Sequence, residues 1–318
     1  MENRYRPRRT CLSVPGSSAK MIQKAKTLPA DQVFLDLEDA VAPEAKAQAR
    51  EQVAAALAEP GWSGALRGVR VNDWTTPWTH ADIIEVVARA GTALDVVVLP
   101  KVTDVSHVYA LDLLLGQLEA THDLPLGHIG IEAQIEDAKG LTNVDLIAAA
   151  PRVQALVLGP ADLMASLNMR TLEVGEQPEG YGEGDAYHHV LMRILVAARA
   201  NGIAAIDGPY LKVRDVEAFR RVAGRSAALG YDGKWVLHPD QIEAGNEIYS
   251  PRQEAYDHAE LILEAYEWHT SKAGGARGAA MLGDEMIDEA SRKMALVIAG
   301  KGRAAGMQRK GERFQPPS

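Results

Sequence analysis

A chain of 318 residues that is 47% hydrophobic and 24% charged can bury a sizeable core, which excludes global disorder. Its 34 Lys and Arg residues and 43 Asp and Glu residues give a formal net charge of −9, so there is no general electrostatic case for binding nucleic acid. The single cysteine, Cys11, excludes an internal disulfide framework and a cysteine-based zinc site, and it favours a reducing compartment.

The amino-terminal segment is basic, as in a signal peptide, but no apolar segment follows it before Pro15 and Gly16. The longest apolar runs, such as 96–99, are far shorter than the ~20 residues that a membrane helix needs. We therefore expect a cytoplasmic protein that makes no membrane contact.

Eight short apolar runs alternate with longer helical patterns along the chain. Several of these runs are apolar on both faces, as strands of a parallel sheet covered by helices must be. Eight β-then-α units within roughly 250 residues favour an α/β fold, a (β/α)8 barrel of the TIM type, over an open doubly wound sheet. The predicted strands are 11–14, 32–37, 68–72, 95–99, 128–135, 153–158, 203–206 and 234–237.

The barrel is expected to occupy residues 1–250, with a long loop over 168–184 of a length that is usually functional or disordered. Helical patterns on either side of a flexible linker at 271–280 predict a helical extension over 251–300, its last helix covering 284–298. The basic residues 301–318 end in two prolines and predict a disordered tail.

Polar residues collect where the predicted strands end, which is the edge at which TIM barrels carry their active sites. One acid in such a position could simply cap the next helix, but so many together indicate an active site. They are Asp36, Glu38, Asp39, Arg70, Asn72, Lys101, Glu132, Gln134, Glu136, Asp162, Asp207 and His238.

The residue types at these ends restrict the chemistry. Glu136 and Asp162 come from adjacent strand ends without a nearby His or Cys, and such hard oxygen ligands suit Mg²⁺. Arg70 could bind a substrate carboxylate through two parallel hydrogen bonds from its guanidinium group. No Gly-x-Ser-x-Gly elbow occurs, which disfavours a serine hydrolase. No lysine lies within an obviously apolar strand, so a Schiff-base aldolase is not indicated, although Lys101 keeps that chemistry open.

A second candidate site follows the first predicted strand. The segment 15–18 leads into a helix that carries Lys20 and Lys24 one turn apart on one face. Backbone N–H groups at the start of that helix, together with the two lysines, would hold a phosphate. An ordinary Ser-capped helix with solvated lysines fits this segment equally well.

Seven motifs follow one another in order between about residue 9 and residue 300. They are Leu35-Asp-Leu-Glu-Asp-Ala-Val-Ala-Pro43, Arg70-Val-Asn72, Leu99-Pro-Lys-Val102, Ile135-Glu136, Leu158-Gly-Pro-Ala-Asp-Leu163, Asp207-Gly-Pro209 and Gly233-Lys-Trp-Val-Leu-His-Pro239. Together they resemble the citrate lyase β-subunit-like acyl-CoA lyases of the HpcH/HpaI aldolase superfamily. The later motifs and the long loop are most similar to the malyl-CoA/β-methylmalyl-CoA lyase branch.

The resemblance implies a reversible carbon–carbon cleavage of a 3-hydroxy-acyl-CoA that depends on Mg²⁺ or Mn²⁺. Malyl-CoA or β-methylmalyl-CoA would give the 2-oxo acid glyoxylate and acetyl-CoA or propionyl-CoA. The resemblance also implies that Glu136 and Asp162 bind the metal and that Arg70 holds the 2-oxo-acid carboxylate. Glu38 and Asp39 would orient Arg70 and metal-bound water.

The same resemblance implies that the carboxy-terminal extension is a lid over a neighbouring subunit's site, with Asp288 as the acid/base residue. A shared lid implies a closed homo-oligomer, a homotrimer or homohexamer. Ser13 stands where the family usually has an aromatic residue, and Ser18 where a basic residue is frequent, while Lys24 matches the pattern. The implied substrate and CoA contacts are Ser18, Lys24, Arg70, Ala161, Asp162, Leu237 and His238.

Three other functions remain open from the sequence. The same site could activate water and act as a malyl-CoA thioesterase. The chain could instead be a citramalyl- or citryl-thioester lyase subunit that works on a carrier-protein thioester. A metal-dependent aldolase acting on free keto acids is the third alternative.

Overall fold

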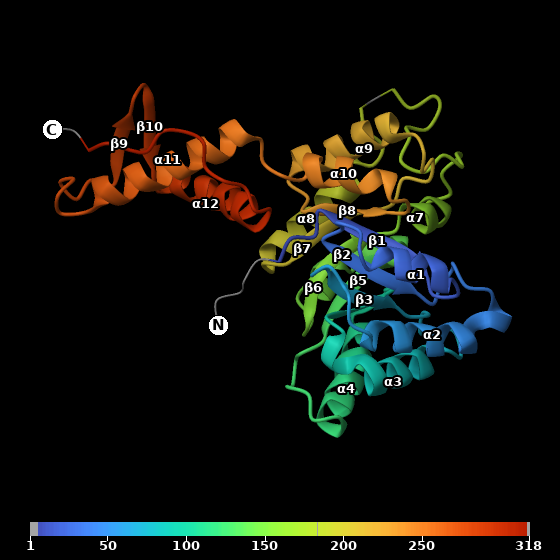
Figure 1. Cartoon of the computed structure of the whole chain (residues 1–318). Helices are drawn as coiled ribbons and strands as arrows, with labels where there is room; N and C mark the ends of the chain where they lie inside the picture. Colours follow the sequence, from blue (N-terminus) through green and yellow to red (C-terminus); the bar gives the residue numbers. More distant parts are fainter. Residues whose placement is uncertain (1–5, 183, 317–318) are drawn as a thin grey trace. The chain divides into compact units, whose positions relative to one another are not determined.

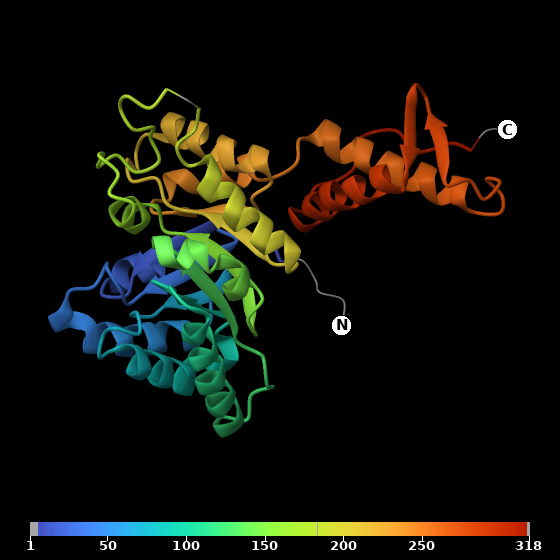
Figure 2. The same ribbon diagram turned by 180° about the vertical axis from the view of Figure 1, so that it is seen from behind.

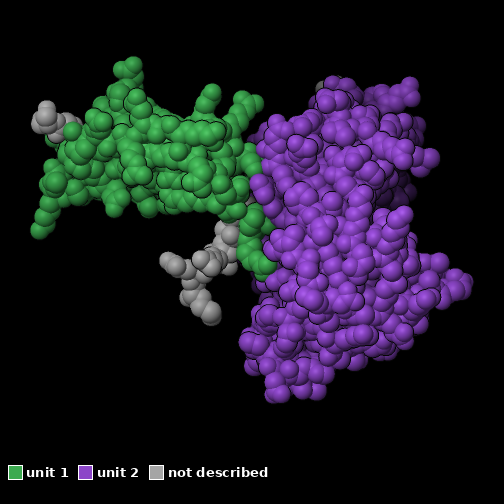
Figure 3. Space-filling view, viewed as in Figure 1, with its two compact units in different colours: residues 1–7, 250–318 green, residues 8–249 purple. Residues whose placement is uncertain are grey.

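The computed structural model describes residues 6–182 and 184–316. The chain divides into two compact units, one of residues 8–249 and one of residues 1–7 and 250–318, which Figure 3 shows in different colours. Within the described residues, no helix combines the length and hydrophobicity needed to cross a membrane.

The larger unit is a closed barrel of eight parallel strands in sequence order, with helices outside (Figures 1 and 2). The predicted (β/α)8 barrel is therefore confirmed, and each predicted strand is present with its ends shifted by two residues or fewer. The strands are β1 (Thr10–Pro15), β2 (Gln32–Asp36), β3 (Leu66–Arg70), β4 (Val96–Leu99), β5 (Gly130–Ile135), β6 (Val153–Leu158), β7 (Ala204–Asp207) and β8 (Gly233–Val236).

Helices cover the outer face of the barrel because alternate strand residues point outward and are apolar. Val33 and Leu35 of β2, for example, belong to the large core between the strands and the helices. Pro43 opens a short 3₁₀ turn, η1 (Pro43–Ala45), and a second one, η2 (Gly91–Ala93), precedes β4. The helices are α1 (Ala19–Ala25), α2 (Lys46–Ala58), α3 (Thr79–Ala90), α4 (Val105–Thr121), α5 (Ala138–Thr142), α6 (Val144–Ala148), α7 (Pro160–Ser166), α8 (His188–Ala200), α9 (Val216–Leu229) and α10 (Asp240–Ile248).

The inside of the barrel is a packed core, and its polar groups lie at the two ends. Phe34 and Trp235 meet edge to face inside it, with ring centroids 5.1 Å apart. This filling means that only the strand ends can present chemistry to a ligand. The interior cluster comprises Cys11, Phe34, Val98, Ala155, Val157, Ile206 and Trp235.

Glu132 lies at the opposite end of β5 from Glu136, although both face the barrel interior. Arg8 Nε donates to Glu132 Oε1 over 2.8 Å, and Gln32 Nε2 donates to Oε2 over 2.8 Å. All three residues are buried. Glu132 therefore belongs to a buried polar cluster at the amino-terminal end of the barrel. It is not one of the candidate active-site residues at the carboxyl ends of the strands.

The smaller unit contains a β-hairpin that the sequence pattern did not reveal. The elements are α11 (Gln253–Thr270), β9 (Ala279–Leu282), β10 (Glu285–Asp288) and α12 (Glu289–Ala304). The hairpin replaces part of the expected flexible linker and the first turn of the expected last helix. Each strand has only four residues, and although Ile287 is buried, Met281 and Met286 are exposed, so the apolar residues do not mark one face in the sequence.

The basic segment after residue 300 also differs from the expectation of disorder. Helix α12 continues to Ala304. Beyond it, the backbone N–H groups of Lys310 and Phe314 donate over 2.9 Å to Asp257 and Glu264 of α11. These hydrogen bonds hold the segment against α11.

Candidate active site

Four strand ends bring charged side chains together at the carboxyl-terminal mouth of the barrel. Arg70 is the last residue of β3, Glu38 lies two residues beyond β2, and Lys101 lies two residues beyond β4. Glu136 follows β5 directly. Carboxyl ends of neighbouring parallel strands meet at one edge, which is why residues so distant in sequence become neighbours.

Arg70 is the best anchored of these side chains. Its Nε and Nη2 donate to the two carboxylate oxygens of Asp36 over 2.8 and 2.7 Å, and its Nη1 lies 2.8 Å from Glu38 Oε2. The guanidinium carbon lies 4.8 Å from the centroid of the Trp235 ring, which forms the floor beneath it. Burial alone would lower the pKa of Arg70, but the charge and hydrogen bonds of Asp36 outweigh it and raise this pKa. Arg70 is therefore a fixed cation, and its five N–H donors are enough to hold a substrate carboxylate as well.

Lys101 connects the two buried acids of the site. Its Nζ donates to Glu38 Oε1 over 2.6 Å, and its backbone N–H donates to Glu136 Oε1 over 2.6 Å. The residue has a φ of +50°, a left-handed conformation that is uncommon outside glycine. Burial lowers the pKa of Lys101, but the hydrogen bond and charge of Glu38 outweigh it and raise this pKa. A permanently protonated amine is a poor nucleophile, which argues against Schiff-base chemistry at Lys101.

Glu136 is buried and hydrogen-bonded through both oxygens. Besides the bond from Lys101, its Oε2 accepts a 2.6 Å hydrogen bond from Gln134 Nε2. Burial raises the pKa of Glu136 to about 8, and the negative charges of Glu38 and Asp162 contribute to this increase. Burial also raises the pKa of Glu38, although Arg70 and Lys101 offset part of that effect. The site therefore disfavours the ionised forms of both acids, and a cation bound beside them would favour ionisation.

Glycine at position 159 gives the Glu136 side chain its space. A Cβ atom added to Gly159 would lie closer than 3.0 Å to both the Cβ atom and the Oε2 atom of Glu136. Gly159 caps the short helix α7, and Asp162 stands exposed in the first turn of that helix. The sequence Gly-Pro-Ala-Asp thus leaves room for the Glu136 side chain at Gly159 and places Asp162 in the first turn of the helix that follows.

The residues present fit a Mg²⁺ ion. Two carboxylates, Glu136 and Asp162, offer hard oxygen donors, and the neighbouring Gln134 Oε1 is buried without a hydrogen-bond partner. Among residues 6–182 and 184–316, no three His, Cys, Asp or Glu side chains are arranged to hold a metal ion by themselves. A cation bound here would therefore take part of its shell from substrate and water, as Mg²⁺ commonly does.

The pKa of Glu136 predicts how stability depends on pH. In the folded protein the pKa of Glu136 is about 8, above the ordinary value of 4.5. The contribution of Glu136 to the free energy of unfolding is therefore fully present below pH 4.5 and is lost as the pH rises through 8. We expect the Tm of the metal-free protein to fall between pH 5 and 8.5, and to fall less in Glu136→Gln. Thermal unfolding in EDTA across this range measures both. Equal pH slopes in the two proteins would contradict the assigned environment of Glu136.

Gly159→Ala should distort the site, because the added methyl group overlaps the Glu136 carboxyl group. Overpacking of this kind typically costs about 1–3 kcal/mol, and here it also displaces the acid. We expect a lower Tm and a higher Mg²⁺ concentration for half-maximal activity. Gly224→Ala in α9 is the matched control, since its Cβ would meet nothing within 4 Å and alanine favours a helix. Equal Mg²⁺ requirements in both variants would contradict the spatial role of Gly159.

Glu38, which was expected to orient Arg70 and metal-bound water together with Asp39, does contact Arg70, and Asp36 supplies two further hydrogen bonds to it. The side chain of Asp39 is 60% exposed and lies 3.6 Å from Lys101 Nζ. The signal for Asp36 was the strand alternation, because Phe34 of the barrel interior and Asp36 lie two residues apart on one face. Asp36 therefore belongs to the site as the residue that orients Arg70.

The residues expected to contact CoA lie at three strand ends. Ser18 caps α1 by accepting from the Met21 N–H, and Lys24 is exposed on that helix. Ala161 is exposed at the start of α7, beside Asp162. Leu237 is half-buried against the barrel interior, and His238 Nδ1 lies 3.3 Å from Asp240 Oδ2. The structure shows where these residues lie and gives no ligand contact for them.

Asp288 lies in the smaller unit, as the cap of α12. Its Oδ1 accepts from the backbone N–H groups of Ala290 and Ser291, and Ser291 completes a capping box. The backbone hydrogen bond from Ser291 lowers the pKa of Asp288. The residue is therefore ionised, and its carboxylate has a structural role within its own unit.

The expectation that no lysine lies within an apolar strand is wrong. Lys234 in β8 is only 1% exposed. It faces away from the barrel interior, since the neighbouring Trp235 faces inward, and its Nζ is paired with Asp207 over 2.7 Å. Lys234 is thus no Schiff-base candidate at the mouth of the barrel.

Comparison with known proteins agrees with this geometry. The model of the HpcH/HpaI aldolase/citrate lyase family matches residues 9–239, which span the barrel. The chain belongs to this family. The family membership and the class of enzyme predicted from the motifs, a carbon–carbon lyase, are confirmed.

Individual relatives match almost the whole chain. The chain is 39% identical to an L-malyl-CoA/β-methylmalyl-CoA lyase of Cereibacter sphaeroides, over 92% of this chain and 94% of the relative. It is 34% identical to a (3S)-malyl-CoA thioesterase of the same species, over 84% and 86%. The CitE protein of Mycobacterium tuberculosis, solved with magnesium, acetoacetate and coenzyme A, is 29% identical with a TM-score of 0.70, over 94% and 98%.

Proposed function

We propose that this protein is a Mg²⁺-dependent lyase that cleaves malyl-CoA or β-methylmalyl-CoA to glyoxylate and acetyl-CoA or propionyl-CoA. The observation that carries the proposal is the convergence of Arg70, Glu38 and Glu136 at the mouth of the barrel. The similarity to a malyl-CoA/β-methylmalyl-CoA lyase over 92% of the chain supports it.

Each residue has a defined task in this proposal. Arg70, held by Asp36, binds and orients the carboxylate of the 2-oxo-acid part of the substrate. Glu136 and Asp162 are the metal ligands, and Lys101 positions Glu136 through its backbone N–H. Mg²⁺, or Mn²⁺ in its place, would supply Lewis-acid stabilisation of the substrate oxygen where negative charge develops.

Asp288 is our candidate for the proton acceptor, supplied by the lid of a neighbouring subunit in a homotrimer or homohexamer. Its lowered pKa keeps it ionised, as a base must be. Asp288→Asn should reduce kcat by about 10²–10⁴-fold with little change in KM. Asparagine is also a good helix cap, so α12 should survive the change. Asp284→Asn, at an exposed position in the same hairpin, is the control; an unchanged kcat in Asp288→Asn would remove Asp288 from the chemistry.

The thioesterase is the second candidate, because a relative with that name is 34% identical. The two reactions differ in their products. The lyase releases glyoxylate together with acetyl-CoA, whereas the thioesterase releases malate and free CoA.

The deciding experiment offers the purified chain a panel of 3-hydroxy-acyl-CoA esters with and without Mg²⁺. The panel includes the malyl, β-methylmalyl, citramalyl and citryl esters, and the released 2-oxo acid and CoA are both measured. Stoichiometric glyoxylate from malyl-CoA, dependent on Mg²⁺, supports the proposal. Malate without glyoxylate favours the thioesterase. Inactivity on every free CoA ester would favour a subunit that needs a carrier protein.

A further inference from the structure

A buried polar cluster outside the barrel wall lies next to the segment that carries Asp162. Asp207 ends β7, and its Oδ2 accepts from Lys234 Nζ and from Ser226 Oγ, each over 2.7 Å. Tyr249 closes the cluster with its hydroxyl 2.7 Å from Ser226 Oγ. All four residues are at least 95% buried, and none has a task in the function proposed above.

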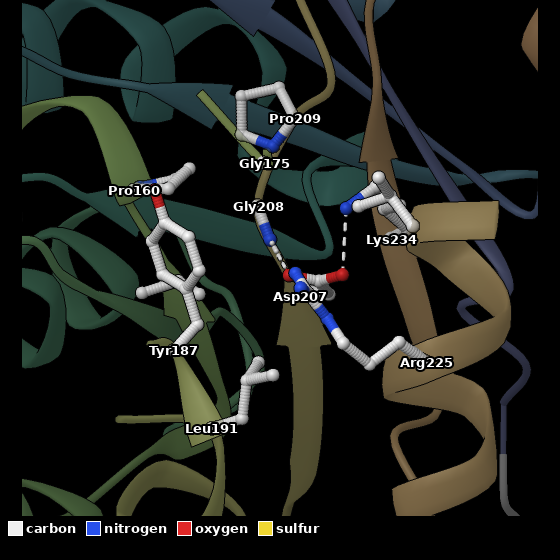
Figure 4. Close-up of a pocket in the computed structure, with 11 residues that line it drawn as sticks. Pro160, Gly175, Tyr187, Leu191, Asp207, Gly208, Pro209, Arg225 and Lys234 are labelled. Carbon is white, nitrogen blue, oxygen red and sulfur yellow. Dashed lines mark hydrogen bonds and ion pairs between the residues drawn. The ribbon is translucent and has the colours of Figure 1, made fainter. Parts of the chain in front are cut away.

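The cluster is not a ligand site. Figure 4 shows Asp207 between Lys234 and the backbone of Gly208, with Pro160 and Tyr187 on the other side. The cavity among these groups has a volume of about 10 Å³, room for one water molecule. Their role must therefore be sought in packing.

Burial of an ion pair needs a reason other than stability. Apolar residues of similar volume are often equally or more stabilising, because removing two charges from water carries a large penalty. Burial here lowers the pKa of Lys234, although Asp207 offsets part of that effect. A retained pair of this kind can instead fix one conformation.

The conformation that the pair fixes is the turn after β7. The other oxygen of Asp207, Oδ1, accepts from the Gly208 N–H over 2.8 Å. Gly208 packs directly on the β6–α7 turn, since a Cβ there would lie closer than 3.0 Å to Pro160 and to the Leu158 carbonyl oxygen. Pro160 is the first residue of α7, two positions before Asp162. The opposite side of the same turn is held where Gly159 meets Glu136.

We propose that the Asp207–Lys234 pair is a positioning device for Asp162, acting through the contact of Gly208 with Pro160. This inference rests on the proposed function, in which Asp162 is a metal ligand. With the pair intact, the β6–α7 turn is held from both sides, which fixes the backbone that carries Asp162. Without it, Gly208 loses its anchor and the start of α7 is free to shift.

The test is Mg²⁺ binding to the full chain, measured by isothermal titration calorimetry. Lys234→Met should raise the Kd for Mg²⁺ about tenfold or more, the effect typical of losing a residue that supports a metal ligand. At saturating Mg²⁺, the KM for malyl-CoA should stay near the wild-type value. Arg8→Met is the matched control, because it breaks the buried Arg8–Glu132 pair at the other end of the barrel. It should lower the Tm without changing the Kd.

Three outcomes are decisive. A raised Kd in Lys234→Met together with an unchanged Kd in Arg8→Met supports the inference. An unchanged Kd in both variants, with a lowered Tm, shows a purely structural pair and overturns the inference while the proposed function stands. Wild-type protein that binds no Mg²⁺, even with glyoxylate present to complete the shell, overturns the proposed function and this inference with it.

A double variant covers the case in which Lys234→Met does not fold. Asp207→Leu with Lys234→Met leaves no unpaired charge and keeps the side-chain volumes similar, so folding is expected. It still removes the hydrogen bond to Gly208. A raised Kd for Mg²⁺ in this variant supports the positioning role, and a wild-type Kd overturns it.

Discussion

Asp162→Asn should abolish Mg²⁺-dependent turnover and leave the barrel folded. The side chain is exposed in the first turn of a short helix, so its replacement should change the free energy of unfolding by about 0.5 kcal/mol or less. The loss of an anionic ligand should weaken Mg²⁺ binding by about 100-fold or more. Calorimetry with Mg²⁺ and the rate of glyoxylate release measure the two effects.

The same substitution has a second, independent signature. The negative charge of Asp162 contributes to the raised pKa of Glu136, so its removal should lower that pKa from about 8. The pH at which metal-free protein loses stability should move down accordingly. Asp145→Asn is a matched control, because Asp145 is also exposed in the first turn of a short helix, α6. Full Mg²⁺-dependent activity in Asp162→Asn would remove Asp162 from the metal site.

Arg70→Lys should cost the enzyme about 10²–10³-fold in kcat/KM, even though the positive charge is kept. A lysine amine cannot form the two parallel bonds to Asp36 and also contact Glu38. In the condensation direction, we expect the KM for glyoxylate to rise strongly and the KM for acetyl-CoA to change little. This split follows from the proposed contact between Arg70 and the carboxylate of the 2-oxo acid.

Arg152→Lys is the control for the structural effect of replacing a buried arginine by lysine. Arg152 is another largely buried arginine, paired with Asp112 and Glu119, and it directly precedes the amino-terminal end of β6, away from the carboxyl ends that form the site. Its replacement should lower the Tm without altering either KM. If Arg70→Lys behaves in the same way as Arg152→Lys, the substrate contact assigned to Arg70 is contradicted.

The sequence was sufficient for the barrel because its signals are local and repeated. Each buried strand is a short apolar run, and each is followed by at least one helix, so eight repeats leave few alternative folds. The same regularity located Arg70, Glu38 and Glu136, because parallel strands must place their carboxyl ends together. Errors arose where a signal was absent. The β9–β10 hairpin has strands of only four residues, and it buries Ile287 but exposes Met281 and Met286, so its apolar residues do not mark one face.

The sequence by itself determined the barrel, the family and the set of strand-end acids around Arg70. Only the tertiary structure decided which acid pairs with which basic side chain. Asp36 shares Arg70 with Glu38, Glu132 belongs to the far end of the barrel, and Lys234 is buried outside its wall. The physical reason is that strand periodicity assigns a residue to a face, whereas pairing and pKa depend on distances of a few ångströms between segments remote in sequence.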